Sequence, residues 1–310
     1  MILVGDVGGT NTRLGLAARE AGEWRLSHLR VEPTPQELGP LLRGYLAASR
    51  PPSVTAIAIC GAGPKRPDGT LSLTNHPLVL DPAKLAKDSG IARVAILNDF
   101  EAVAWSLPAL GETGTRAFGG GTRVARAPCV VLGAGTGLGV AALVPAGANA
   151  WTAAPGEGGH VDLAPVDDEE LAAWTRLRAQ LGRVSAEHVL SGAGLERLHT
   201  ALHGVKVEAP AISQALADGD AQAVTTVRVF SRWLGRVAGD LALTLVAKGG
   251  VYIAGGIVPG WKDRFDAKAF RAGFEDKAPH GALLRSIPTF VVTHPQPGLL
   301  GLAAYADPGT

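Results

Sequence analysis

The sequence contains little cysteine, almost no net charge and no long uninterrupted apolar segment. Two cysteines, Cys60 and Cys129, occur in 310 residues, and neither has a cysteine or histidine at metal-ligand spacing. They are therefore predicted to be buried free thiols in a reducing compartment, not a disulfide or a zinc site. The 29 Lys and Arg residues nearly balance the 28 Asp and Glu residues. This balance gives no electrostatic reason to expect nucleic acid or an anionic membrane as a partner.

The apolar segments are short and interrupted. Asp6 and the glycines after it break the opening apolar run, so no signal peptide is expected. The most apolar helical candidate, residues 237–247, contains Asp240 and is too short to span a bilayer. Apolar residues nevertheless make up 46% of the chain and charged residues 18%. That composition predicts a folded, soluble protein, and we expect it in the cytoplasm.

Apolar runs, glycine-rich turns and amphipathic segments follow one another in a pattern that predicts an α/β protein. Strands are expected in residues 2–6, 12–18, 54–59, 93–99, 129–144 (two strands and a turn) and 249–258. Helices are expected in residues 37–48, 99–107, 168–181 and 220–247. Residues 111–128, rich in Gly, Thr and Arg, are predicted to be a loop or a domain junction. The chain length and the return of the opening pattern at residue 129 suggest two domains.

The first glycine turn, Gly8 to Asn11, lies between two expected strands and follows an acid, Asp6. Glycine lets the backbone approach a ligand closely, and successive N–H groups at such a turn can bind phosphate. Asp6 would repel phosphate unless a cation lay between them, and Mg²⁺ combines one or two carboxylates with phosphate oxygens. The stretch therefore favours a phosphate–Mg²⁺ turn. Glycines that only form a hairpin turn would explain this single stretch equally well.

A second glycine turn has no acid beside it and contains Gly133, Gly135, Thr136 and Gly137. Two phosphate-type turns, of which one is acidic, suit a nucleoside triphosphate held between two domains. The chain contains no G-x-x-x-x-G-K-[ST], which excludes a P-loop protein. The dinucleotide pattern G-x-G-x-x-G also fails, because Leu138 occupies its last glycine position.

Polar residues suited to a polyhydroxyl ligand lie outside these turns. Asn98 and Asp99 end an expected strand, where ligands bind in open α/β sheets, and Asp99 could accept a proton from an attacking hydroxyl. Either residue could instead cap the following helix. Glu157 and His160 lie in a Gly-rich loop that could be an ordinary solvated turn. Glu187 precedes an expected helix and could be a simple N-terminal helix acid.

Taken in order, these stretches resemble the bacterial ATP-dependent glucokinases of the hexokinase/actin-like superfamily. The matching stretches run from residue 5 to about residue 301 and are GDVGGTNTRLGL, TNHPL, LNDFEAVAW, LGAGTGLGVA, PGEGGHVDLAP, EHVLSGAGLERL, GGVYIAGGIVP, FRAGFEDK and PGLLG. The resemblance implies a two-domain α/β fold of the actin-like, hexokinase-like (ribonuclease H-like) type with an interdomain active-site cleft. It implies a smaller N-terminal domain, residues 1–110 with residues 293–310 returning to it, and a larger domain, residues 111–292.

The activity that the resemblance implies is transfer of the γ-phosphoryl group of ATP, with Mg²⁺, to the 6-hydroxyl of D-glucose in glycolysis. Asp99 would be the general base. The implied sugar contacts are Asn75, Asn98, Asp99, Glu157, His160 and Glu187. The implied nucleotide contacts are Asp6 (through Mg²⁺ and water), Gly8, Gly9, Thr10, Asn11, Gly133, Gly135, Thr136, Gly137, Gly255 and Gly256. Homodimers are common in the family, so a homodimer is expected.

Related groups leave other functions open. The ROK group of sugar kinases and repressors carries a cysteine-rich zinc loop soon after the E-x-G-H motif, but no cysteine follows His160 here, so no zinc is expected. The first strand is expected to begin at Ile2, so the N-terminal helix-turn-helix of the repressors is not expected. The alternatives are a broader hexokinase acting on mannose, glucosamine or fructose, a non-catalytic sugar-binding regulator, and an actin-like ATPase.

Overall fold

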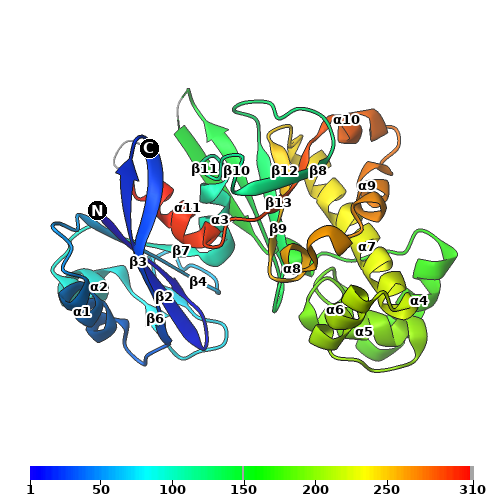
Figure 1. The fold of residues 1–310 in the computed structure, drawn as a ribbon, viewed down its shortest axis with the longest axis horizontal. Helices are drawn as coiled ribbons and strands as arrows, with labels where there is room; N and C mark the ends of the chain where they lie inside the picture. The colour runs from blue at the N-terminus through cyan, green and yellow to red at the C-terminus, as the bar shows by residue number, and fades with distance from the viewer. Residues whose placement is uncertain (149, 308–310) are drawn as a thin grey trace. The chain divides into compact units, whose positions relative to one another are not determined.

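The computed structural model describes residues 1–148 and 150–307, and the chain divides into two compact units (Figure 1). Unit 1 contains residues 1–113, 145–155 and those from 294 onward. Unit 2 contains residues 114–144 and 156–293. Across the described part of the chain, no helix is both long enough and apolar enough to cross a membrane.

Unit 1 contains a five-stranded sheet with the strand order β3-β2-β1-β4-β7. Its strands are β1 (Ile2–Val7), β2 (Asn11–Glu20), β3 (Glu23–Pro33), β4 (Ala56–Gly61) and β7 (Val94–Asn98). A small ribbon of β5 (Leu71–Ser72) and β6 (Val79–Leu80) is separate from it. The β1–β2 pair is an antiparallel hairpin, as predicted, whereas β1, β4 and β7 run parallel. The carboxyl ends of these three parallel strands therefore meet at one edge of the sheet.

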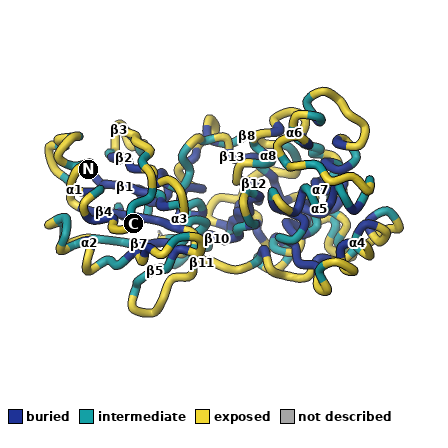
Figure 2. Tube along the Cα trace, turned by 90° about the horizontal axis from the view of Figure 1, so that it is seen from below, coloured by how far each residue is buried: buried dark blue, intermediate teal, exposed yellow. Residues whose placement is uncertain are grey.

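Successive side chains of β1 enter two different apolar layers, because side chains alternate across a strand. Leu3 packs in the layer that includes α1 and α2, and Val4 packs in the layer that includes α3 and α11. Figure 2 shows the central strands buried between these layers, whereas β3 at the edge is largely exposed. The helices of unit 1 are α1 (Leu38–Ser49), α2 (Pro82–Ser89), α3 (Asp99–Ser106) and α11 (Pro297–Tyr305).

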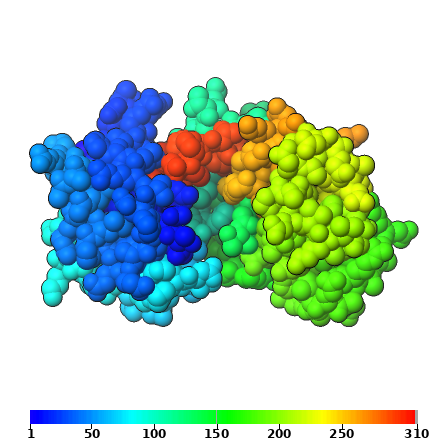
Figure 3. Space-filling model, turned by 60° about the horizontal axis from the view of Figure 1, so that its bottom comes forward, coloured from blue at the N-terminus to red at the C-terminus, as the bar shows by residue number. Residues whose placement is uncertain are grey.

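The last helix returns to the beginning of the chain. In Figure 3, α11 (red) lies beside the N-terminal segments (blue), and it contacts both β1 and α3. A Cβ atom at Gly301 would lie 1.7 Å from the carbonyl oxygen of Ala102. Only glycine therefore allows α11 to pack this closely against α3, which begins directly after β7.

A six-stranded sheet with the order β11-β10-β9-β12-β13-β8 has most of its strands in unit 2, whereas residues 150–155 of its edge strand β11 are counted in unit 1. Its strands are β8 (Thr115–Gly119), β9 (Cys129–Ala134), β10 (Leu138–Ala146), β11 (Ala150–Gly156), β12 (Gly250–Gly255) and β13 (Thr289–Val292). The β9–β10 hairpin repeats the arrangement of β1 and β2, and β12 lies parallel to β9. The second glycine turn and the end of β12 consequently lie at the same edge of this sheet.

The helices of unit 2 are α4 (Asp168–Leu181), α5 (Gly192–His203), α6 (Ala209–Asp218), α7 (Ala221–Leu245), α8 (Ile257–Trp261), α9 (Ala267–Glu275) and α10 (Gly281–Ser286). A short 3₁₀ turn, η1 (Gly158–His160), lies between β11 and α4, and another, η2 (Lys262–Arg264), lies between α8 and α9. The long helix α7 contacts α5, α6 and α9 and buries Phe230 and Trp233 completely. Arg232 and Arg236 of α7 pair with Glu170 of α4, whose side chain is fully buried.

Residues 111–128 were predicted to be a loop or a domain junction, and the boundary between the two units does fall there, after Thr113. They are not all loop, because Thr115–Gly119 form β8 and pair antiparallel with β13. The five residues of β8 show no clear apolar alternation. Backbone pairing with β13 and the edge-to-face contacts of Phe118 with Phe265 and Phe270 are what make them a strand. The strand β3 was also not expected, because most of its side chains are exposed and its alternation is weak. Both cysteines are buried and free, as predicted.

Candidate functional site

The first glycine turn joins β1 to β2 and is held by hydrogen bonds to its backbone. The N–H of Gly8 donates to the carbonyl of Asn11 at 2.9 Å, and the Thr34 hydroxyl donates to the carbonyl of Gly8 at 2.7 Å. A Cβ atom at Gly9 would lie 3.1 Å from the carbonyl oxygen of Asn75. The loop that carries Asn75 is thus brought against the turn. The exposed residues of the turn are Gly9, Thr10 and Asn11.

Asp6 lies next to the end of β1, beside this turn. Its Oδ2 accepts a hydrogen bond from Arg13 Nη1 at 3.3 Å, and its Oδ1 accepts one from the Cys60 thiol at 3.8 Å. Burial raises the pKa of Asp6 above its ordinary value, and the Arg13 charge opposes that shift. The side chain still keeps 32% of its surface exposed. A carboxylate is therefore accessible beside the glycine turn.

Cys60 connects the surroundings of Asp6 with those of Asp99. Burial, followed by the negative charges of Asp6 and Asp99, raises the pKa of this thiol well above its ordinary value. The thiol therefore stays neutral and donates its hydrogen to Asp6.

Three strand ends form one row at the edge of the sheet in unit 1. Val7 of β1 pairs with Gly61 of β4, and Gly61 pairs with Asn98 of β7. Asn98 is also the N-cap of α3, since its Oδ1 accepts hydrogen bonds from the N–H groups of Phe100 at 2.9 Å and Glu101 at 3.3 Å. The Glu101 carboxylate accepts the N–H of Asn98 at 3.2 Å, which completes a capping box. The capping role considered for Asn98 is therefore present.

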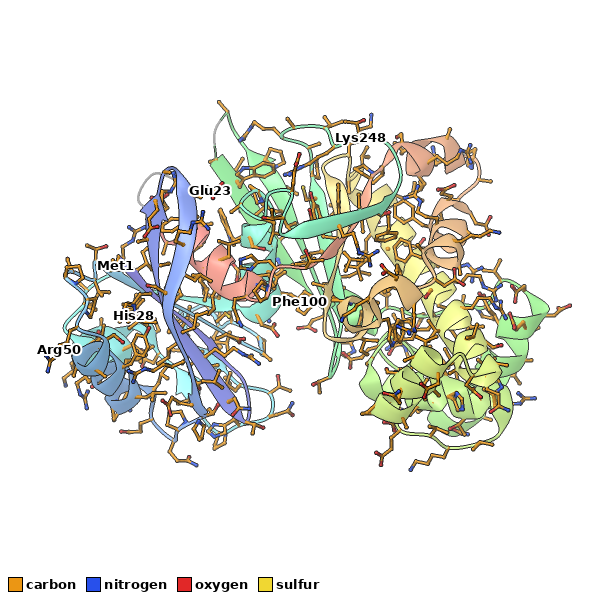
Figure 4. The ribbon with its side chains drawn as sticks, in the orientation of Figure 1. Met1, Glu23, His28, Arg50, Phe100 and Lys248 are labelled. Atoms are coloured by element: carbon orange, nitrogen blue, oxygen red, sulfur yellow. The ribbon has the colours of Figure 1, made fainter. Side chains whose placement is uncertain are left out.

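Asn98 and Asp99 form different hydrogen bonds at the carboxyl edge of the sheet in unit 1. The Asn98 amide nitrogen donates to the carbonyl of Gly63 at 3.2 Å. Asp99 is the first residue of α3, and its Oδ1 accepts the N–H of Phe100 at 2.9 Å (Phe100 is labelled in Figure 4). The first turn of a helix stabilises negative charge. The position thus favours an ionised carboxylate, which is the form that can accept a proton.

The second glycine turn joins β9 to β10 in unit 2. The N–H of Gly135 donates to the carbonyl of Gly137 at 2.9 Å, and the N–H of Gly192 donates to the carbonyl of Gly135 at 2.8 Å. The N–H of Leu138 donates to Oε2 of Glu187 at 2.8 Å. A Cβ atom at Gly137 would lie 2.4 Å from the same oxygen. The turn is therefore packed against the Glu187 side chain, and Thr136 is at its tip.

His160 lies between two acids in the same unit. Its Nε2 is 3.7 Å from Oε2 of Glu157, and its Nδ1 is 4.0 Å from Oε1 of Glu187. The N–H of Glu187 donates to the carbonyl of Gly159 at 2.7 Å, and Arg183 donates to the carbonyl of His160 at 2.7 Å. The fold thus brings together the three predicted sugar contacts of unit 2. Among the residues that the structure describes, no three His, Cys, Asp or Glu side chains are placed to hold a metal ion together.

Glu187 is not an acid of the following helix. That helix, α5, begins at Gly192 and is capped by Ser191. The interpretation of Glu187 as a helix-terminus acid is therefore wrong, and its carboxylate instead faces the glycine turn and His160.

The glycines of β9 and β12 that were predicted to contact the nucleotide lie on neighbouring strands of one sheet. Gly133 pairs with Ala254, and Gly255 pairs with Ala134. Gly255 has a φ of +84°, and a Cβ atom there would lie 2.3 Å from the carbonyl oxygen of Ala134. Both the dihedral angle and the close approach require glycine at this position. Gly256 follows as the N-cap residue of α8.

A pocket of about 360 Å³ opens beside Gly256. Sequence reasoning did not anticipate this pocket, whose lining comes from separate helices: Leu195, Ala209, Pro210, Ser213, Leu216, Ala217, Gly256, Ile257, Gly260, Trp261 and Arg264. Its lining is mainly apolar. The indole N–H of Trp261 donates to the Ser213 hydroxyl at 3.1 Å. The pocket therefore offers an apolar surface with a fixed hydroxyl group.

Three further residues that hold the candidate site in place were not predicted from the sequence. The Asn98-x-x-Glu101 spacing is a capping-box pattern and could have been recognised in the sequence. Thr34 and Arg183 carry no local signal, because they reach their partners across 26 and 23 residues.

Comparison with known proteins identifies the family. The model of the glucokinase family matches residues 3–308 of the chain. The chain belongs to the glucokinase family. Glucokinases of Tolumonas auensis and Pectobacterium atrosepticum are 42% and 41% identical to this family member. Each comparison covers 98% of this chain and 96% of the relative.

Solved glucokinase structures have the same fold. The crystal structure of a glucokinase from an Antarctic psychrotroph is 30% identical, covers 98% of both chains and has a TM-score of 0.90. A ROK family glucokinase from Streptomyces griseus, solved with glucose and AMPPNP, has a TM-score of 0.66, is 21% identical and covers 98% of both chains. At 21% identity, the comparison with the Streptomyces griseus enzyme shows only that the two chains share a fold. The expected hexokinase-like, actin-like α/β fold is confirmed, and this glucokinase-family chain is an enzyme of the sugar kinase class.

Proposed function

We propose that this chain transfers the γ-phosphoryl group of Mg-ATP to the 6-hydroxyl of D-glucose, giving glucose 6-phosphate and ADP. The chain is a member of the glucokinase family. Within it, the observation that best supports this proposal is the row of strand ends in unit 1. That row places an acidic glycine turn and the Asn98–Asp99 pair at one edge of one sheet. Phosphoryl transfer requires a phosphate site and a group that accepts the hydroxyl proton, and residues of this edge are proposed for both roles.

Asp99 is proposed to act as the general base. It orients the 6-hydroxyl of the sugar and accepts its proton as the oxygen forms a bond to the γ-phosphorus. The bond between that phosphorus and the bridging oxygen of ADP breaks in the same step. The helix terminus at which Asp99 lies favours the ionised carboxylate. Asn98 and Asn75 are proposed to bind other sugar hydroxyls from the same unit.

The surroundings of Asp6 fit a magnesium ion. Mg²⁺ keeps several waters and takes one or two carboxylates together with phosphate oxygens. Asp6 offers one partly exposed carboxylate beside a turn whose exposed residues are Gly9, Thr10 and Asn11. Magnesium bound there through water would offset the negative charge of the phosphate oxygens. The backbone of the turn, with Gly8, is proposed to position the phosphates.

Unit 2 is proposed to bind the sugar through Glu157, His160 and Glu187. Two acids that each lie within 4.0 Å of one imidazole offer both acceptors and a donor to neighbouring hydroxyls. The turn formed by Gly135, Thr136 and Gly137, with Gly133 before it, is proposed to contact phosphate. Its backbone is accessible, because a Cβ atom at Gly135 would meet nothing within 4 Å.

The pocket beside Gly256 is proposed to receive the adenosine of the nucleotide. Its mainly apolar lining suits the faces of a purine, and the Ser213 hydroxyl supplies a directional contact. Gly255 and Gly256 would allow the nucleotide to approach the backbone closely.

The deciding experiment is ADP release from Mg-ATP without sugar and with glucose, mannose, fructose, glucosamine or N-acetylmannosamine. Strong stimulation by glucose is the expected result. Equal stimulation by several hexoses would favour a broader hexokinase. Release that no sugar stimulates would favour an ATPase, and sugar binding without turnover would favour a regulator.

We also infer that the chain acts in the cytoplasm, at the entry of glucose into glycolysis, as a homodimer. These points rest on the family alone. Light scattering coupled to gel filtration tests the homodimer directly, because a monomer and a dimer differ twofold in mass.

A further inference from the structure

The loop that carries Glu157 and His160 pairs with the segment that carries Glu187. Three backbone hydrogen bonds of 2.7 to 3.0 Å join the two in antiparallel register, from the N–H groups of Leu163, Ala186 and Glu187 to the carbonyls of Val184, Val161 and Gly159. Asp162 lies opposite Ser185 within this short ladder. None of these three hydrogen bonds uses the backbone of His160, so they do not fix the peptide on either side of that residue.

Arg183 contacts the loop from the opposite segment. Helix α4 ends at Leu181, and Gly182 then has a φ of +75°, so that Arg183 begins the segment that faces the loop. Its Nη2 donates to the carbonyl of His160 at 2.7 Å, and its Nε donates to Oδ1 of Asp162 at 2.5 Å. One guanidinium group therefore joins the backbone of residue 160 to the side chain of residue 162.

This bridge acts on the peptide that carries the imidazole. A guanidinium group is planar and its N–H donors have fixed spacing, so two bonds from it set the direction of the His160 carbonyl relative to Asp162. The imidazole lies 3.7 Å from Glu157 and 4.0 Å from Glu187. Rotation of the backbone at His160 would carry the ring away from one or both acids. The bridge therefore bears on the arrangement of all three side chains.

Stability does not explain why the bridge is present. Arg183 keeps 62% of its side chain exposed, and Asp162 keeps 77%. An ion pair between side chains this exposed contributes little to the free energy of unfolding. A binding site, in contrast, requires its groups to be held within about 0.5 Å of the productive geometry by the residues around them. Placement of His160 is therefore the better explanation of the bridge.

We propose that Arg183 is a positioning residue for sugar binding, which holds His160 between Glu157 and Glu187 by joining its carbonyl to Asp162. The inference rests on the proposed function, since it takes the sugar as the ligand of these three side chains. It adds to that function a residue that does not itself contact the sugar. Arg183 thereby determines the affinity for the sugar without taking part in phosphoryl transfer.

The test compares Arg183→Met with Arg116→Met in the full chain. Arg116 makes the same two kinds of contact in unit 2, since it donates to the carbonyl of Lys262 at 3.1 Å and pairs with Asp263 at 3.5 Å. Arg183→Met is expected to raise the KM for glucose about tenfold, because small misplacements of binding groups are costly. The kcat, the KM for ATP and the melting temperature should stay near the parent values. Arg116→Met should leave the KM for glucose unchanged.

Two further variants separate position from charge. Arg183→Lys keeps the positive charge but lacks the planar fork, so it should recover only part of the glucose affinity. Adding Asp162→Ala to Arg183→Met should raise the KM for glucose no further, because both residues act through one bridge. Full recovery in Arg183→Lys, or additive effects in the double variant, would overturn the proposal. So would an Arg183→Met chain with the parent KM for glucose.

Failure of the proposed function would look different. Calorimetric titration of the parent with glucose, and with the other hexoses if glucose gives no heat, shows whether the chain binds a sugar at all. A parent that binds none of them would overturn the proposed function and this inference with it. A parent that binds glucose no more tightly than Arg183→Met does would overturn this inference alone.

Discussion

Oε2 of Glu187 accepts the backbone N–H of Leu138 at 2.8 Å, which ties the segment between α4 and α5 to the second glycine turn. Oε1 of the same carboxylate lies 4.0 Å from the imidazole of His160. One side chain therefore contacts both the turn proposed for phosphate and the cluster proposed for sugar. A change at this position should affect the two substrates together.

Replacement of Glu187 tests that double contact. Glu187→Ala should raise the KM for glucose at least tenfold and also raise the KM for ATP, because it leaves the Leu138 N–H without its acceptor. Glu187→Gln keeps an oxygen that can accept that N–H and should affect mainly the glucose KM. Steady-state kinetics with each substrate varied separately distinguish the two effects. Equal and small changes in both variants would contradict the assignment.

Asp99→Asn should lower kcat by about two to four orders of magnitude, because the amide cannot accept the hydroxyl proton. Glucose binding, followed by calorimetry, should change much less. Asp81→Asn is the matched control, since Asp81 caps α2 through its side chain in the same unit and asparagine caps helices equally well. Near-normal turnover by Asp99→Asn would sink the base assignment.

Two changes at Asn98 separate capping from sugar binding. Asn98→Asp keeps the oxygen that accepts the N–H groups of Phe100 and Glu101 but loses the N–H that donates to Gly63. It should keep most of the thermal stability and bind glucose weakly. Asn98→Ala should also lose the cap, which is worth about 0.5–2 kcal/mol. Melting temperatures and glucose titrations give the two readouts. Full glucose affinity in Asn98→Asp would count against a sugar contact.

The pKa of Asp6 predicts a pH-dependent gain in stability. Burial raises this pKa in the folded chain, so the folded state binds the proton more tightly than the unfolded state. The ionised carboxylate consequently destabilises the fold at neutral pH, and this cost vanishes below the unfolded pKa of about 4. Asp6→Asn should melt at a higher temperature than the parent at pH 7, and the difference should shrink toward pH 4. Scanning calorimetry across this range measures it.

Asp68 provides a control whose pKa is shifted in the opposite direction from that of Asp6. Hydrogen bonds from the N–H and hydroxyl of Thr70 lower its pKa, so the charged form stabilises the fold above the unfolded pKa. Asp68→Asn should therefore lower the melting temperature at pH 7, with the loss fading on acidification. The Asp6 prediction fails if Asp6→Asn behaves in the same way as Asp68→Asn.

Two glycines distinguish a ligand contact from a packing constraint. A Cβ atom at Gly159 would lie 2.2 Å from the carbonyl oxygen of Leu138, whereas one at Gly135 would meet nothing within 4 Å. Gly159→Ala should lower the melting temperature by several degrees. Gly135→Ala should leave it unchanged and raise the KM for ATP, because the added methyl group blocks close approach of phosphate. An unchanged KM for ATP in Gly135→Ala would remove this turn from the phosphate site.

The sequence by itself determined the local features of this protein. Both hairpins were predictable because apolar runs and glycine turns are adjacent in the chain, and the Asn98–Asp99 strand end was predictable because it joins a buried strand to a capped helix. The ordered motifs were sufficient to indicate the family. Each of these signals is contained within a few neighbouring residues.

The tertiary structure decided everything that depends on distant partners. β8 is a strand because β13 pairs with it, 170 residues further along the chain, and not because of its own residues. The contact of Glu187 with Leu138 and the pocket beside Gly256 arise from segments that lie far apart in the sequence. Local propensity carries no information about such contacts, because they depend on which surfaces of the folded chain pack together.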